Sequence, residues 1–96
     1  MVRYNVRLLD TNTGAEGAYS FENREDLLSR PADDVVAAFF DYADREIFDR
    51  GHIAYELNGV LKNKKQGAVV AIGSMYMNEG RNEEDLQPFT IFISRA

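Results

Sequence analysis

Cysteine is absent from this chain of 96 residues, and histidine occurs once, as His52. Without cysteine there is no disulfide framework, no thiol nucleophile and no thiolate zinc site. A single histidine also excludes a metal site built on two imidazoles. The two prolines and seven glycines form no low-complexity tract. We therefore expect one ordered globular domain that covers residues 1–96.

Long hydrophobic runs are also missing. Stretches such as Ala68 to Ile72 are far shorter than the roughly 20 apolar residues that cross a bilayer. The opening segment MVRYNVRLLD lacks the pattern of a charged region followed by an apolar one that is typical of signal peptides. These features predict a soluble, cytoplasmic protein that does not enter membranes.

Positive charge is scarce, and the net charge is −5. Residues 1–48 contain five arginines against ten carboxylates, whereas residues 49–96 contain six cations against six carboxylates. An acidic surface repels phosphate backbones, so the composition disfavours general binding of nucleic acids. The simplest interpretation of this charge is that it keeps the protein in solution.

Between Pro31 and Phe48 the apolar residues repeat with the period of an amphipathic helix. They are Val36, Phe39, Phe40, Ala43 and Ile47. Before and after this segment the period drops to two, which is typical of strands with one buried face. The alternating residues are Val2, Tyr4, Val6 and Leu8 before the helix, and Phe89, Ile91 and Ile93 after it.

These periods predict an α+β fold in the order β-β-α-β-β-β. We expect an antiparallel sheet of about five strands with the one amphipathic helix packed on one face. The first hairpin should pair residues 2–9 with residues 18–22, and the last strand should open at Pro88 and cover 89–94. Ser29 or Asp33 is the expected N-cap of the helix, and Gly51 its expected C-terminal stop.

The segment after Gly51 fits two patterns. Ile53, Tyr55 and Leu57 alternate as in a strand, yet Ile53, Leu57, Val60 and Leu61 also fit a helical stripe. We favour a strand, because tyrosine, isoleucine and valine are enriched in strands and the following polar loop resembles the end of a hairpin.

The strand predicted from Ala68 to Met77 is apolar on both faces, which is typical of a strand inside a sheet. Val69, Ala71, Gly73 and Met75 should face the helix. Val70 and Ile72 should lie on the opposite face, together with Phe92. One helix covers only one face, so these side chains predict an exposed apolar patch that binds a protein partner, most simply a second copy of the chain.

Two other groups of residues could carry chemistry. All the lysines of the chain, Lys62, Lys64 and Lys65, fall in four positions and could bind a phosphate, a small anion or a nucleic acid. His52 could pair with Glu56 for acid–base catalysis in a small enzyme. Neither group matches a specific motif. We therefore assign no catalytic, cofactor or metal residues, and expect a non-catalytic interaction module that self-associates through the uncovered sheet face or a sheet edge.

Overall fold

The computed structural model describes residues 1–11, 14–24, 26–47, 54–76 and 86–96. These residues form five strands, one α-helix and a single short 3-10 helix. In chain order they are β1 (Val2–Asp10), β2 (Glu16–Asn23), η1 (Leu27–Ser29), α1 (Ala32–Glu46), β3 (Tyr55–Asn63), β4 (Ala68–Tyr76) and β5 (Leu86–Arg95).

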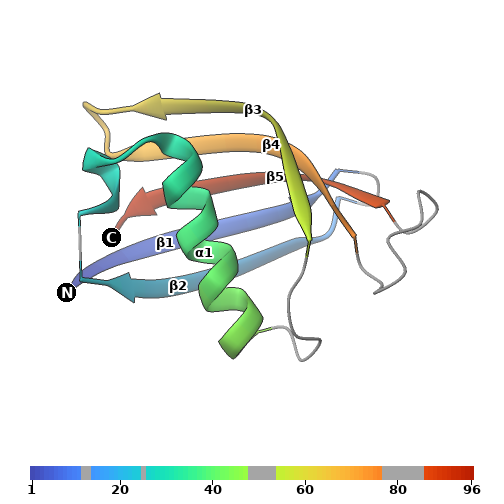
Figure 1. The fold of residues 1–96 in the computed structure, drawn as a ribbon, viewed down its shortest axis with the longest axis horizontal. Helices are drawn as coiled ribbons and strands as arrows, with labels where there is room; N and C mark the ends of the chain where they lie inside the picture. The colour runs from blue at the N-terminus through green and yellow to red at the C-terminus, as the bar shows by residue number, and fades with distance from the viewer. Residues whose placement is uncertain (12–13, 25, 48–53, 77–85) are drawn as a thin grey trace.

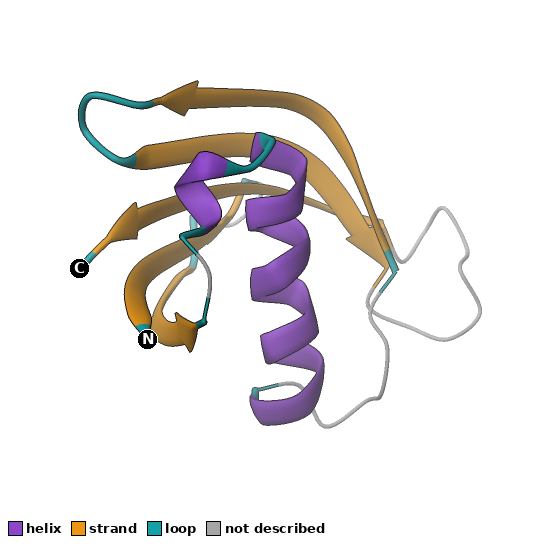
Figure 2. Cartoon of the chain, turned by 60° about the vertical axis from the view of Figure 1, so that its left-hand side comes forward, coloured by secondary structure: helices purple, strands orange, loops and turns teal. Residues whose placement is uncertain are grey.

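All five strands belong to one antiparallel sheet with the order β2-β1-β5-β4-β3. The two hairpins, β1–β2 and β3–β4, are joined by β5, which lies at the centre of the sheet. α1 crosses the strands on one face (Figure 1), and a view from the side places it clear of the other face (Figure 2). The predicted α+β architecture and the order β-β-α-β-β-β are confirmed.

The core lies between α1 and the sheet. Val36, Phe39, Phe40 and Ala43 of the predicted helical stripe are buried, and the inward residues of the strands meet them. The ring of Phe40 lies edge-on to that of Phe89 in β5, with the ring centroids 5.6 Å apart. Offset and edge-on aromatic pairs of this kind stabilise a core beyond the area that they bury.

The start of the helix differs from the prediction. Pro31 is the N-cap residue, and no side chain caps the helix there, so the predictions of Ser29 and Asp33 as caps are wrong. The Ser29 hydroxyl instead donates to the backbone carbonyl of Asp26, because η1 occupies the residues just before the helix. Asp33 lies in the first turn, where a carboxylate favours the positive end of the helix dipole. Gly51, the expected helix stop, lies outside the described residues.

The segment after residue 54 is a strand, as predicted, and a β-bulge explains its double pattern. The pairing of β3 with β4 shifts register between Leu57 and Gly59. The extra residue, Asn58, brings Leu57 and Val60 to the same side of the sheet, where both pack against the core. Three-residue spacing therefore arises in a strand and imitates a helix.

β4 is an internal strand, paired with β3 on one side and β5 on the other. Gly73 lies in it where space is short, because a Cβ atom there would clash with the backbone carbonyl of Glu56 and lie 3.1 Å from the Phe89 ring. β5 begins at Leu86, so the prediction that Pro88 opens the strand is wrong by two residues. Pro88 is tolerated because it lies past the last β1–β5 pair, Asp10 with Phe89, so its missing N–H removes no bond of that ladder; its carbonyl accepts a hydrogen bond from the Thr11 N–H.

Candidate functional site

The face of the sheet opposite α1 carries a contiguous group of apolar side chains, which we call the apolar band: Leu61, Val70, Ile72 and Phe92. Leu61 pairs with Val70, and Val70 with Phe92, so these residues form one row across β3, β4 and β5. Ile72 lies two residues further along β4 on the same face. Among the described residues, no helix covers this face.

The apolar band is unusually exposed for side chains of this size. Leu61 is 76% exposed, Ile72 52% and Phe92 47%. Met1, at the chain end, is the other large apolar side chain in the described residues with such exposure. Single exposed apolar residues are common, but three of four gathered on neighbouring strands indicate an interaction surface.

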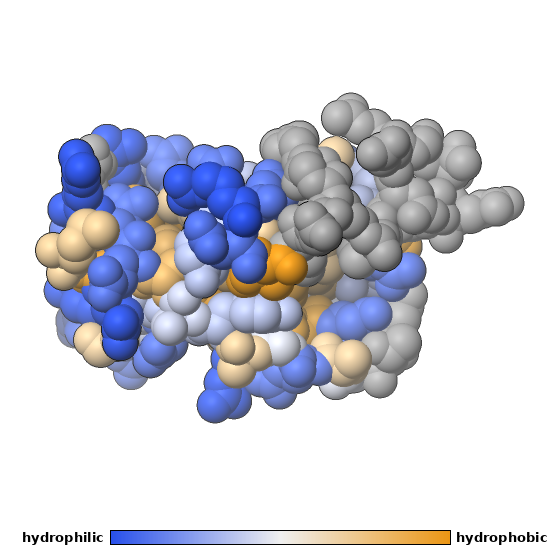
Figure 3. All heavy atoms as spheres, turned by 90° about the horizontal axis from the view of Figure 1, so that it is seen from below, coloured by the Kyte–Doolittle hydropathy of each residue, from blue (hydrophilic) through white to orange (hydrophobic). Residues whose placement is uncertain are grey.

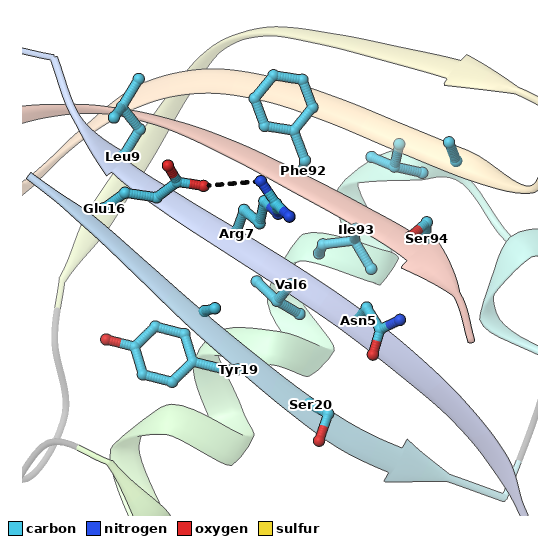
Figure 4. A pocket seen from close by; sticks show the side chains of 13 residues that line it. Asn5, Val6, Arg7, Leu9, Glu16, Tyr19, Ser20, Phe92, Ile93 and Ser94 are labelled. Carbon is cyan, nitrogen blue, oxygen red and sulfur yellow. Dashed lines mark hydrogen bonds and ion pairs between the residues drawn. The ribbon is translucent and has the colours of Figure 1, made fainter. Parts of the chain in front are cut away.

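The other half of the same face is polar and balanced in charge. Arg3 of β1 pairs with Glu22 of β2 at 3.2 Å, and Arg7 pairs with Glu16 at 3.4 Å. The Arg7–Glu16 pair lines a hollow of about 820 Å³ over β2, β1, β5 and the start of β4. Figure 4 shows Arg7, Glu16 and Phe92 on this face of the sheet, with Phe92 beside the ion pair. The hollow therefore joins the apolar band to the charged flank.

The two edges of the sheet are less suited to pairing with another strand. β2 is an edge strand that carries the charged residues Glu16 and Glu22, and charged edges discourage strand addition. The surface seen from the side of β2 is mostly hydrophilic (Figure 3). At the β3 edge, the bulge between Leu57 and Gly59 interrupts the regular ladder that strand addition needs. The sequence predicts association through either the uncovered sheet face or a sheet edge. Of these two, the open face is therefore better suited to bind a partner.

The three lysines do not form one group. The Lys62 ammonium group donates to the backbone carbonyl of Arg30 at 2.6 Å and so ties β3 to the segment before α1. Lys64 and Lys65 are exposed in the turn between β3 and β4. They line a second hollow, of about 320 Å³, together with Asp26 and Arg95. No pattern in the sequence joins Asp26 and Arg95 to this turn, because both residues lie far from it in the chain.

The pKa values of two side chains, Asp26 and Tyr55, differ from their ordinary values. A hydrogen bond from Arg95 is the main cause that lowers the pKa of Asp26. Burial opposes it as the second-largest effect, and hydrogen bonds from Leu28 and Tyr4 lower the pKa further. Burial raises the pKa of Tyr55, and nearby carboxylates, Asp41 first, raise it further. Tyr55 stacks on Phe40 in the core at a ring distance of 4.2 Å, which accounts for its loss of water.

Of the possible catalytic pair His52 and Glu56, the structure describes Glu56. His52 lies outside the described residues, and Glu56 is exposed in β3. In the part of the chain that the structure describes, no three histidine, cysteine or carboxylate side chains gather as a metal site would require. The described helices also include none with the length and apolar content needed to cross a bilayer.

Comparison of the chain with models of protein families, with curated protein sequences and with solved structures gave no match. The function is therefore argued from the surface itself.

Proposed function

We propose that this protein is a small interaction module that self-associates through the open face of its sheet. The observation that carries the proposal is the apolar band, where Leu61, Ile72 and Phe92 are each about half exposed or more. Two such faces packed together would form a sandwich, with the bands of both copies in its core. The absence of cysteine fits a reducing compartment such as the cytoplasm.

The charge pattern favours a second copy as the partner on this face. Each copy carries two arginines and two glutamates on the β1–β2 flank, in the pairs Arg3–Glu22 and Arg7–Glu16. A surface with equal numbers of both signs carries no net charge that would repel a copy of itself, and a two-fold axis can bring the arginines of one copy to the glutamates of the other. The opposite side of the molecule repels a copy of itself, because α1 has five carboxylates and one arginine.

The size of the face is adequate for a dimer. Five strands about 4.8 Å apart, rising about 3.3 Å per residue, outline roughly 24 by 30 Å. This approaches the ~800 Å² that each partner contributes to a standard interface. Covering the exposed half of Phe92 and of Ile72 contributes about 1 kcal/mol each. Because association itself costs several kcal/mol, we expect a dimer of modest affinity, near the micromolar range.

Sedimentation velocity over a concentration series tests the proposal. The wild-type chain should shift from monomer to dimer as its concentration rises. Replacing Ile72 and Phe92 with serine removes four buried side chains from the dimer, two in each copy. At about 1 kcal/mol each, the binding free energy falls by about 4 kcal/mol and the dimer should be roughly 1,000-fold weaker. Ala37→Ser, on α1, is the matched control and should leave association unchanged. A wild-type chain that stays monomeric at high micromolar concentration would overturn the proposal.

A further inference from the structure

A second hollow lies at the end of the sheet, and its lining is mainly charged and polar, unlike the apolar band. The turn between β3 and β4 forms one wall with Lys64, Lys65 and Gly67. η1 and its cap form another with Asp26 and Ser29, and Arg95 at the end of β5 forms the third. Its volume is about 320 Å³.

The charge of this hollow is opposite to that of the chain. Among the described residues that line it, Lys64, Lys65 and Arg95 are positively charged and Asp26 is negatively charged. Within the described residues, Lys64 and Lys65 have no carboxylate partner. A local excess of positive charge in a chain with net charge −5 is the arrangement that attracts an anion to one place.

The walls of the hollow are fixed by hydrogen bonds. Gly67 adopts a φ of +62°, which favours glycine, and its carbonyl accepts a hydrogen bond from the Arg95 N–H at 3.1 Å. The Gln66 N–H donates to the Asn63 side chain at 3.2 Å, within the same turn. Lys62 anchors the strand that leads into the turn through the Arg30 carbonyl. Because these bonds fix the backbone from which Lys64, Lys65 and Arg95 extend, a ligand need not order that backbone when it binds.

We propose that this hollow binds a compact phosphate-bearing anion, either free pyrophosphate or the phosphates of a nucleotide. The two ammonium groups of the turn and the guanidinium at the end of β5 suit the several oxygens of a phosphate. Asp26 competes for the guanidinium of Arg95, since the two form an ion pair. None of the described residues that line the hollow is aromatic, so they offer no stacking surface to a single-stranded nucleic acid.

Calorimetric titration of the full chain with inorganic pyrophosphate at low ionic strength tests this site. We expect saturable binding of one anion per chain, and a loss of about tenfold for each of Lys64→Ala and Lys65→Ala. Arg45→Ala also removes one positive charge, but Arg45 lies on α1 and does not line the hollow, so this variant should retain binding within about twofold. Asp26→Asn keeps the cap of η1 and frees Arg95, and should tighten binding severalfold. Circular dichroism confirms that each variant is folded.

The outcomes separate the alternatives. Tighter binding of ADP than of pyrophosphate would support the site and identify a nucleotide as the source of the phosphates, and equal binding would support the site with free pyrophosphate sufficient. Three results would overturn the proposal: no saturable binding at millimolar pyrophosphate, equal weakening by Arg45→Ala and Lys64→Ala, or preference for a DNA duplex. None of these variants alters the apolar band, so failure here leaves self-association untouched.

Discussion

The Tyr4 hydroxyl provides the sharpest test of how the segment before α1 is held. Tyr4 is fully buried, and its oxygen accepts a hydrogen bond from the Leu27 N–H at 2.8 Å. Tyr4→Phe removes only this oxygen and keeps the ring that stacks on Phe21 at 5.4 Å. The buried Leu27 N–H would then lack this acceptor, which costs about 1–3 kcal/mol. For a domain of this size each kcal/mol lowers Tm by about 4–8 °C.

Urea unfolding followed by circular dichroism measures this loss, and thermal unfolding checks it. Tyr19→Phe is the matched control, because Tyr19 is half-buried and packs on Phe39, while its hydroxyl has no hydrogen-bond partner among the residues described. The control should change the free energy of unfolding by less than about 0.5 kcal/mol. Equal free energies for the two variants would refute the role given to the Tyr4 hydroxyl.

Three further substitutions probe other parts of the fold. Because the folded pKa of Tyr55 is raised above 10.0, stability should be complete below that pH and fall as the pH rises through the folded pKa; Tyr55→Phe should abolish this alkaline loss in urea unfolding. Because Arg95 lowers the pKa of Asp26 below 3.8, stability should hold above that pH and fall as the pH drops through the folded pKa; Asp26→Asn should flatten this acid loss in the same assay. Gly73→Ala should destabilise the protein by about 1–3 kcal/mol, since the new Cβ clashes with the carbonyl of β3, whereas Gly59→Ala, where a Cβ makes an ordinary contact of 3.4 Å, should be nearly neutral by denaturation.

The elements with a clean period were predictable from the sequence. The stripe of the helix and the alternation of β1 place Tyr4, Val6, Phe39 and Phe40 in the core, because burial of one face imposes one period on each element. The two-sided apolar pattern of β4 also predicted which residues face away from the helix. Ile72 is exposed on that face, as the pattern required.

The parts that depend on contacts distant in sequence were not predictable. The bulge in β3 is set by its pairing with β4, and without that pairing Leu57, Val60 and Leu61 fit a helix as well as a strand. The N-cap of α1 was predicted wrongly because Ser29 belongs to η1, where its hydroxyl donates to the Asp26 carbonyl instead of capping α1. Propensity describes one segment at a time, and tertiary contacts decide between its alternatives.

The bulge also bears on the proposed interface. It turns Leu57 and Val60 toward α1 and leaves Leu61 on the open face beside Val70. In a regular strand Leu57 and Leu61 would face the same side, because they are separated by an even number of residues. The extra residue thus extends the apolar band to the outermost strand and, in the same place, spoils the β3 edge for strand pairing. One local irregularity therefore favours association through the face over association through the edge. Deleting Asn58 keeps Leu57 and Val60 toward α1 and Leu61 on the open face, because the register on both sides of the bulge is unchanged, but it restores a regular β3 edge. In sedimentation experiments the deletion variant should keep the face-to-face dimer and gain higher oligomers, and a variant with no gain of higher oligomers would refute the argument.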